Sequence, residues 1–262
     1  MAIVYILAHF DDEYFATPLI ARNAEMEIEQ RFLYVADYAD PVLATRRLAE
    51  TRAYLARLGV RAEHIVHVGA GSGAWDGQVH RHLPRLHDLL AAELARIETV
   101  SRLFVTAWEG GHMDHDACAA LAVRLSGGAP VEHFSLYNGP QLPGRLFRAG
   151  VPLTENGPPI RVRMSSREWL TFAAGVRYFP SQARTWLGLW PVMFANYLAR
   201  GFGYQSLRPA RVYERPHAGP LLYERMYSVT YAEVAAAIRT AWSPSSSNEI
   251  VRRDQKGSNL NV

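Results

Sequence analysis

Cysteine is almost absent from this chain of 262 residues, since Cys118 is the only one. A single cysteine excludes an internal disulfide framework and fits a reducing compartment, so we expect a cytoplasmic protein. No basic segment precedes the first apolar run, which argues against a signal peptide. We interpret Cys118 as a small buried apolar residue and not as a metal ligand.

Long apolar runs and dense blocks of one charge are also missing. No run approaches the roughly 20 residues of a membrane span, so we expect no membrane-spanning segment. The formal net charge is +3, and the basic residues are scattered without an interleaved aromatic pattern, so no nucleic-acid partner is expected. With 49% hydrophobic residues, the chain can form one large domain or two close-packed lobes.

The first half of the chain alternates between β-type and helical patterns. Short apolar runs predict five strands, at 3–7, 31–36, 64–68, 102–107 and 133–137. Helical patterns separate them, at 14–22, 42–58, 78–98 and 117–125. This alternation with short connections predicts an α/β fold with a doubly wound, Rossmann-like parallel sheet, formed by a core of residues 1–140.

The pattern changes after the fifth strand. We predict a smaller C-terminal lobe, residues 141–242, that covers and recognises the substrate. In it, Leu221–Glu224 is read as a short strand, and a capping box at Thr230 and Glu233 starts the last helix. Four aromatics at helical spacing favour a core over a substrate platform: Trp186, Trp190, Phe194 and Tyr197. The polar residues 243–262 are expected to be disordered.

Two clusters of histidines and carboxylates follow predicted strands. Ala8–Glu13 comes after the first strand and Glu109–Asp116 after the fourth. Since the carboxyl ends of parallel strands meet at one edge of a sheet, the clusters can meet in space. Histidine and carboxylate suit zinc, and three ligands with an open fourth position are typical of a catalytic zinc site; Fe²⁺ or another divalent ion is also compatible.

Helix capping is the alternative explanation for the aspartates of these clusters. Asp11 or Asp12 would cap the first helix and Asp114 the later one. Capping does not explain the paired histidines, His112 and His115, or the matching cluster around His9.

A glycine-rich loop, Gly69–Gly73, follows the third predicted strand. Its spacing differs from the dinucleotide-binding fingerprint, and no ribose-binding acid follows about 20 residues later, so a nucleotide-dependent redox enzyme is disfavoured. Trp75 and Asp76, just after it, are candidate substrate contacts; the alternative is that they only fill the loop.

The two clusters together resemble the paired signature of the PIG-L/LmbE-like zinc deacetylases, which reads A-H-P-D-D-E and then G-H-P-D-H. His9-Phe10-Asp11-Asp12 and His112-Met113-Asp114-His115 match it, with Phe10 and Met113 in place of prolines. The segment from Arg47 to Gly59 also resembles the second helix of that family. The resemblance implies a zinc enzyme that removes N-acetyl groups from amino sugars.

Roles are carried over from the family by position. The resemblance implies that the zinc ligands are His9, Asp12 and His115. It implies that Asp11 is the general base for a zinc-bound water and that His112 assists at the tetrahedral intermediate. Asp114 would hold the ring of His112 or of its neighbour. His217, in a later Pro-His-Ala-Gly segment, is either a contact for the substrate or an ordinary loop histidine.

The expected function is that of a zinc-dependent hydrolase acting on a small molecule. It would remove an acetyl or other acyl group from the nitrogen of an amino sugar or amino-sugar conjugate. One rival is a zinc amidase for a non-sugar N-acyl metabolite in natural-product tailoring. The other is a protein that binds a metal without turnover.

Overall fold

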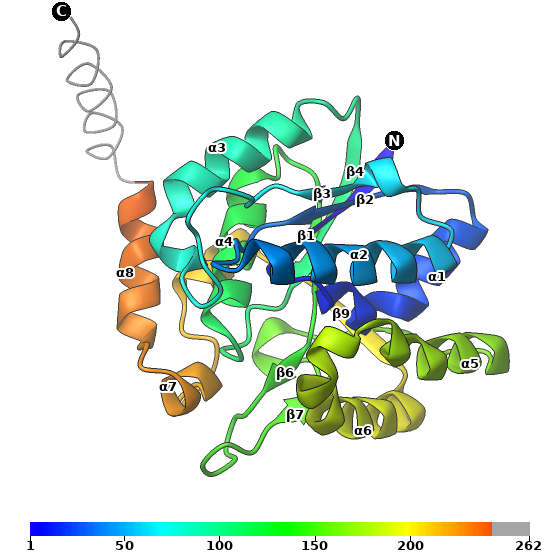
Figure 1. The fold of residues 1–262 in the computed structure, drawn as a ribbon. Coiled ribbons are helices and arrows are strands. Elements are labelled where there is room, and N and C mark those ends of the chain that lie inside the picture. The colour runs from blue at the N-terminus through cyan, green and yellow to red at the C-terminus, as the bar shows by residue number, and fades with distance from the viewer. Residues whose placement is uncertain (243–262) are drawn as a thin grey trace, which may run out of the picture.

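The computed structural model describes residues 1–242, and the tail predicted to be disordered, residues 243–262, lies outside the described residues. A seven-stranded sheet in the order β3-β2-β1-β4-β5-β9-β8 lies between two layers of helices (Figure 1). Its strands are β1 (Ala2–Leu7), β2 (Glu29–Tyr34), β3 (Ile65–His67), β4 (Val100–Thr106), β5 (Val131–Phe134), β8 (Ile160–Val162) and β9 (Phe202–Ser206). A separate hairpin pairs β6 (Tyr137–Asn138) with β7 (Arg148–Ala149).

The helices connect these strands in the expected alternation. They are α1 (Thr17–Glu25), α2 (Pro41–Arg57), α3 (Leu83–Leu94), α4 (Met113–Leu125), α5 (Ser166–Gly175), α6 (Ala183–Arg200), α7 (Leu222–Met226) and α8 (Tyr231–Ala241). The prediction of an α/β fold with a Rossmann-like, mostly parallel sheet is confirmed. None of the helices within residues 1–242 is long and apolar enough to cross a membrane.

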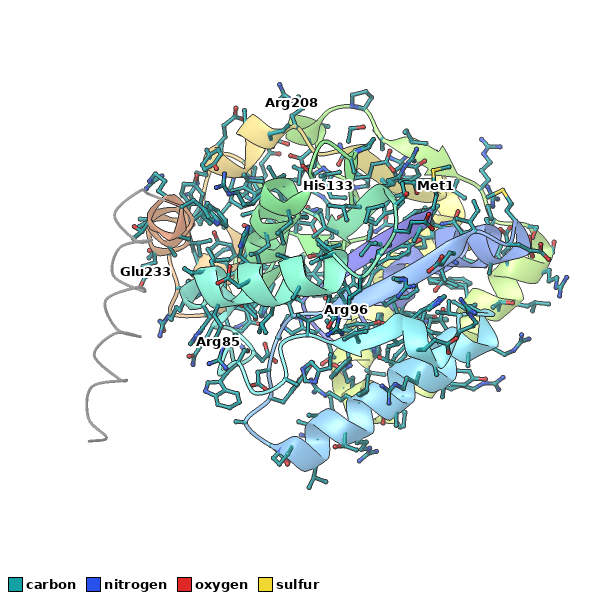
Figure 2. The ribbon with its side chains drawn as sticks, turned by 90° about the horizontal axis from the view of Figure 1, so that it is seen from above. Met1, Arg85, Arg96, His133, Arg208 and Glu233 are labelled. Atoms are coloured by element: carbon teal, nitrogen blue, oxygen red, sulfur yellow. The ribbon has the colours of Figure 1, made fainter. Side chains whose placement is uncertain are left out.

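Side chains alternate between the two faces of the sheet because successive residues of a strand point in opposite directions. From β1, Tyr5 and Leu7 pack toward α1 and α2, whereas Val4 and Ile6 pack toward α3 and α4. Strands buried on both faces read as continuous apolar runs, which is why the sequence pattern found them. Figure 2 shows the layers from above, with α3 and α4 packed over the strands.

Four predicted elements differ in the structure. The helix expected at 14–22 begins only at Thr17, because Asp12–Ala16 forms a 3₁₀ turn, and the strand expected at 133–137 is β5, Val131–Phe134. The helix expected at 78–98 is shorter, because a 3₁₀ turn at Val79–Arg81 precedes α3. The strand expected at Leu221–Glu224 is wrong, since α7 occupies that position. Its first turn closes because the Glu224 carboxylate accepts the backbone N–H of Leu221 at 2.8 Å, and a second N–H comes from Tyr231 at 2.9 Å.

Residues beyond 140 extend the same sheet. β9 pairs antiparallel with β5, and β8 pairs antiparallel with β9, so only the first five strands are parallel. α8 returns to pack against α3 and α4, whereas α5 contacts α1 on the other face of the sheet (Figure 1). The division into a core and a lobe at residue 140 stays a prediction.

The strand order reverses between β1 and β4. From β1 the chain proceeds through β2 to β3 on one side, then crosses to β4 and β5 on the other. Ligands of open α/β sheets bind outside the carboxyl ends of the strands at such a switch point. Both clusters singled out from the sequence follow these two strands.

Candidate metal centre and active site

Three histidines meet at the switch point. His9 follows β1, and His112 and His115 lie at the start of α4, just beyond β4. One ring nitrogen from each lies within 4.8 Å of the other two, and all three side chains are buried. The ring centroids are 4.9 to 5.4 Å apart. The structure therefore brings the two clusters together.

Asp12 joins both sides of this cluster. Its Oδ2 accepts the backbone N–H of His9 at 2.8 Å, and its Oδ1 lies 3.3 Å from Nε2 of His115. Burial would raise the pKa of this carboxyl, but His115 and His9 outweigh burial and hold it well below its ordinary value. Asp12 is therefore a carboxylate directed at a ring nitrogen of the cluster.

Asp11 has a strained backbone beside the cluster. Its φ of 101° lies in a region that residues other than glycine rarely adopt, and such strain is concentrated at functional sites. Burial, reinforced by the neighbouring charges of Asp12 and Glu13, raises the pKa of Asp11 well above its ordinary value. A positive charge placed among the histidines would oppose this rise and favour the carboxylate.

The turn around Asp11 is held by Phe10, which stands where the family pattern has proline. Its backbone N–H donates to the hydroxyl of Tyr38 at 3.2 Å, and its ring stacks on the Tyr38 ring with centroids 5.4 Å apart. Proline has no N–H and could not make this bond. These two contacts with Tyr38 therefore tether the turn.

His112 caps α4. Its Nδ1 accepts the backbone N–H of Asp114 at 3.3 Å, so the cap expected at Asp114 comes from His112 instead. Burial lowers the pKa of His112 to about 4, with the His9 and His115 charges adding to the effect and Asp114 opposing it. The ring is therefore neutral near pH 7. With Nδ1 accepting, the proton is assigned to Nε2.

Asp114 is fully buried and contacts His9 more closely than His112. Its Oδ2 lies 3.2 Å from Nε2 of His9 and 3.9 Å from Nδ1 of His112. The same carboxylate accepts the backbone N–H groups of Gly77 at 2.6 Å and Val79 at 3.0 Å. Asp114 therefore lies closer to the ring of His9 than to that of His112.

Asp76 also belongs to the cluster. Its Oδ1 lies 3.2 Å from Nε2 of His9 and 3.9 Å from Nε2 of His112, and the His9 charge lowers the pKa of this carboxyl. Asp37 holds the preceding loop, because its Oδ2 accepts the N–H of Gly73 at 2.9 Å. A Cβ at Gly69 would lie 1.8 Å from the carbonyl oxygen of Val35, so this glycine allows the loop to pack against the sheet.

The donor set fits a divalent cation. His115 is 1% exposed, Asp12 Oδ1 lies 3.3 Å from its Nε2, and no described residue hydrogen-bonds its Nδ1. Two overlapping sets of His and Asp atoms have the spacing of metal ligands, one with the three histidines and one with His9, Asp76, His112 and Asp114. Imidazole and carboxylate ligands suit zinc, so the cluster has the composition of a zinc-type metal site.

A cavity of about 410 Å³ opens onto this cluster. Besides the cluster residues His9, Asp11, Asp12, Asp76 and His112, its lining includes Phe15, Arg47, Gly77, Leu136, Tyr137, Gln182, Thr185, Trp186, Leu189 and Tyr227. The Tyr137 ring lies 5.4 Å from that of His115, and the Tyr227 ring lies 5.1 Å from that of His112. The lining thus combines polar and ionisable groups with aromatic rings.

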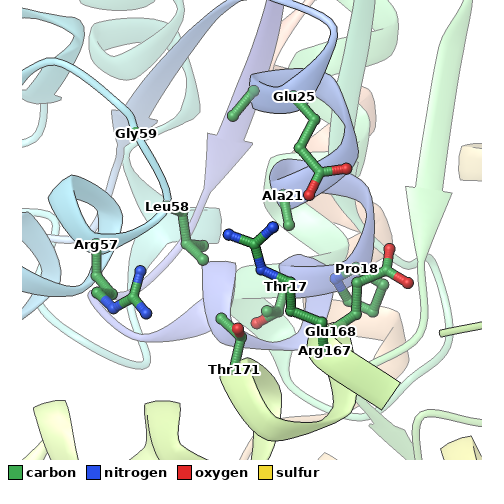
Figure 3. A pocket seen from close by; sticks show the side chains of 11 residues that line it. Thr17, Pro18, Ala21, Glu25, Arg57, Leu58, Gly59, Arg167, Glu168 and Thr171 are labelled. Carbon is green, nitrogen blue, oxygen red and sulfur yellow. The ribbon is translucent and has the colours of Figure 1, made fainter. Parts of the chain in front are cut away.

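A second cavity, of about 270 Å³, lies between α1, the end of α2 and α5 (Figure 3). Arg57, Arg167 and Glu168 are among its lining residues, and it contains none of the histidines. It therefore lacks the chemistry found at the switch point.

Some predicted contacts lie elsewhere, and the sequence missed others. Neither Trp75 nor His217 lines the cavity at the cluster. His217 is buried, and its Nδ1 lies 2.8 Å from the carbonyl oxygen of Ala218. Tyr137 begins β6, three residues after β5 ends, and it is the last residue of the strand predicted at 133–137, so the strand-end argument used for the histidines would have found it. No sequence signal pointed to Tyr227.

The comparisons with known proteins agree with this geometry. Residues 4–126 match the family model described as PIG-L: GlcNAc-PI de-N-acetylase. Over this segment the chain is therefore similar to the PIG-L family. The matched segment contains both histidine clusters, and the resemblance expected from the two motifs is confirmed. No curated protein matches the chain in sequence.

Solved structures share the fold at low sequence identity. A teicoplanin biosynthetic deacetylase mutant is 18% identical with a TM-score of 0.60, covering 79% of this chain and 98% of that one. N,N'-diacetylchitobiose deacetylase from Pyrococcus horikoshii is 15% identical with a TM-score of 0.54, covering 81% and 85%. The 4-carboxy-2-hydroxymuconate hydratase GalB of Pseudomonas putida is 16% identical with a TM-score of 0.51, covering 80% and 97%. The PIG-L fold thus also carries a different chemistry.

Proposed function

We propose that this chain is a metal-dependent N-deacetylase for an amino sugar or amino-sugar conjugate. The main support for the proposal is that the three histidines and Asp12 lie together at the switch point. They lie beside the strained Asp11 and next to a cavity. Metal-assisted hydrolysis uses this arrangement, in which metal-ligating groups lie in a cleft next to a group that can act as acid or base.

His9, Asp12 and His115 would hold the metal, which we expect to be zinc. When bound, a divalent cation supplies positive charge that polarises a carbonyl and lowers the pKa of water. Asp114 would fix the His9 ring, because its carboxylate lies 3.2 Å from Nε2 and is itself held by two backbone N–H groups. A histidine fixed by a buried carboxylate keeps its ligating orientation.

Asp11 and His112 would carry the proton transfers. Asp11 would accept the proton from the attacking water and pass it to the departing amine. His112, neutral and with Nδ1 already accepting a bond, would offer its Nε2–H to the developing oxyanion. These roles use groups whose pKa values are displaced in opposite directions, upward for Asp11 and downward for His112.

The cavity lining supports a small amphipathic substrate. Tyr137, Tyr227 and Trp186 offer ring faces, whereas Arg47, Asp76 and Gln182 offer polar contacts, and sugars present both kinds of surface. Teicoplanin deacetylase and N,N'-diacetylchitobiose deacetylase, which share the fold, are named for glycopeptide and amino-sugar substrates.

Acetate release from a panel of N-acetylglucosamine conjugates by the zinc-loaded protein tests the proposal. Asp11→Asn is the decisive variant, because asparagine tolerates a positive φ and removes only the base. We expect turnover to fall about 10²–10⁴-fold with metal binding retained. The exposed Asp88→Asn is the matched control and should leave turnover unchanged.

Two outcomes would redirect the proposal. Release only from non-sugar N-acyl amides, still lost in Asp11→Asn, would identify the zinc amidase of natural-product tailoring. No release from either panel with metal bound would favour a metal-binding protein without turnover.

A further inference from the structure

The outer side of α6 is an apolar stripe open to solvent. Leu187, Pro191, Ala195 and Leu198 lie on it at a spacing of three or four residues, so they share one helix face, and all four are exposed. The opposite side buries Trp186, Leu189, Met193 and Tyr197. Leu187 is 81% exposed and Leu198 is 66% exposed. We call these four exposed residues the α6 apolar face.

The surroundings of this face are apolar as well. An open groove of about 350 Å³ beside it is lined by Leu187, Trp190 and Pro191, together with Phe179 from the preceding turn. On α5, which packs against α6 through Trp169 and Phe194, Leu170 is 74% exposed. Figure 1 shows α5 and α6 together at one end of the molecule, away from α3 and α8. Several large apolar side chains therefore face water in one region.

The charge of this region is mainly positive. Residues 160–208 contain seven arginines and a single carboxylate, Glu168, which is already paired with Arg22 at 2.9 Å. The Glu50 carboxylate of α2 also reaches this region and accepts the Ser181 hydroxyl at 2.6 Å, but it is paired with Arg46 at 3.2 Å. Arg184 lies one helical turn before Leu187, and Arg177 lines the groove. Within residues 1–242, neither Arg177 nor Arg184 forms an ion pair, and both are exposed. The apolar face is thus bordered by uncompensated positive charge.

Exposed apolar side chains next to unpaired arginines indicate which kind of partner binds the α6 apolar face. In a symmetric dimer each copy would present the same arginines to its partner, and like charges across an interface are repulsive. An anionic lipid bilayer satisfies both features, because acyl chains accept the leucines and headgroups pair with the guanidinium groups. Apolar residues beside arginines on a helix that lies in the surface plane are typical of peripheral membrane attachment.

We propose that the α6 apolar face, with Arg177 and Arg184, docks the protein on anionic lipid bilayers. α6 lies parallel to the surface with Leu187 and Leu198 inserted at the headgroup boundary. Trp186, from the same helix, lines both the groove and the cavity at the metal centre, so docking brings the cavity close to the lipid headgroups. The proposal is independent of the catalytic function proposed above.

Vesicle co-sedimentation of the full chain tests it. We compare vesicles of phosphatidylcholine alone with mixed vesicles of phosphatidylcholine and phosphatidylserine. Leu187→Gln with Leu198→Gln should weaken binding to the mixed vesicles about tenfold or more, through lost apolar burial. Arg177→Gln with Arg184→Gln should weaken it about 25-fold, at roughly fivefold per arginine near the surface. Leu146→Gln, at a leucine 59% exposed in the turn between β6 and β7, is the matched control.

The outcomes are distinct. Binding to the mixed vesicles alone, lost in both double variants and kept in Leu146→Gln, supports the proposal. Equal binding to neutral vesicles, no binding to either, or unchanged binding by the leucine double variant overturns it. Concentration-dependent dimerisation that the leucine double variant abolishes, without vesicle binding, would assign the face to a second copy and also overturns the proposal. Circular dichroism of each variant checks that it is folded.

Discussion

His133 provides a pH-dependent test of the core behind the metal centre. It lies on β5, is 1% exposed, and its Nδ1 accepts the backbone N–H of Trp108 at 3.2 Å. Figure 2 shows His133 among the side chains between α4 and the strands. Burial, with a contribution from the charge of Arg211, lowers the pKa of His133 to about 3. The folded protein therefore holds this ring neutral.

The direction and size of the effect follow from linkage. In the unfolded chain the ring has a pKa of about 6.5. On acidification the ring therefore becomes protonated in the unfolded state but stays neutral in the folded state. The stability associated with the neutral ring is present above about pH 6.5 and is lost as the pH falls toward 3. Lowering the pH from about 7 to about 5 should therefore reduce the free energy of unfolding by about 2 kcal/mol through this single group, at 1.36 kcal/mol per pH unit.

Urea unfolding of the wild type and of His133→Asn at both pH values measures this loss. Asparagine keeps an acceptor near the Trp108 N–H and removes the titration. Its smaller side chain lowers stability at both pH values, so only the difference between the two pH-dependent losses counts. Other titrating groups, such as Glu13, are common to both proteins and cancel. Equal losses in the two proteins, at equal metal content, would refute the reasoning.

Two further predictions concern the metal centre and its support. Removing the metal with a chelator should lower Tm by about 5–10 °C, because metal at a hundredfold excess over its Kd stabilises the folded protein by about 2.7 kcal/mol. Differential scanning calorimetry measures this shift. The shift should disappear in His115→Asn and remain in His217→Asn. Glu109→Gln should destabilise the protein by about 2–4 kcal/mol in urea unfolding. Its buried carboxylate accepts four bonds, from the Ser135 hydroxyl, the Leu136 and Tyr137 N–H groups and the Asn138 amide. The exposed Glu155→Gln should change stability by less than about 0.5 kcal/mol.

The parallel strands and the histidine cluster were predictable because local pattern and position determine them. β1 and β4 are short apolar runs buried on both faces, and a polar cluster directly after such a run must lie at the sheet edge. His9 and His115 could therefore be paired across about a hundred residues without knowing any contact. The choice of Asp12 over Asp11 as the ligand, in contrast, came from the resemblance to the family signature and not from position.

The C-terminal part was less predictable because long-range pairing determines it. β8 has only three residues, and its strand conformation depends on pairing with β9, which in turn depends on the edge of β5. α6 is apolar on nearly all sides, so its sequence predicted a core helix and gave no sign that Leu187 and Leu198 would face water. Trp186 is both buried and a wall of the cavity, so core and substrate platform are not exclusive there.

The buried carboxylate of Asp114 connects a third segment to the two strand ends that hold the histidine cluster. Its carboxylate lies in α4, accepts N–H groups from the loop at Gly77 and Val79, and lies 3.2 Å from the ring of His9 beyond β1. A fully buried carboxylate is costly unless charged or N–H donors surround it, and here they come from two other segments, the loop at Gly77 and Val79 and the residue His9 after β1. The same bonds that satisfy Asp114 bring Asp76 against His9 and fix the orientation of that ring. The segment just after the glycine-rich loop, Asp76 to Val79, thus forms the third side of the His/Asp cluster.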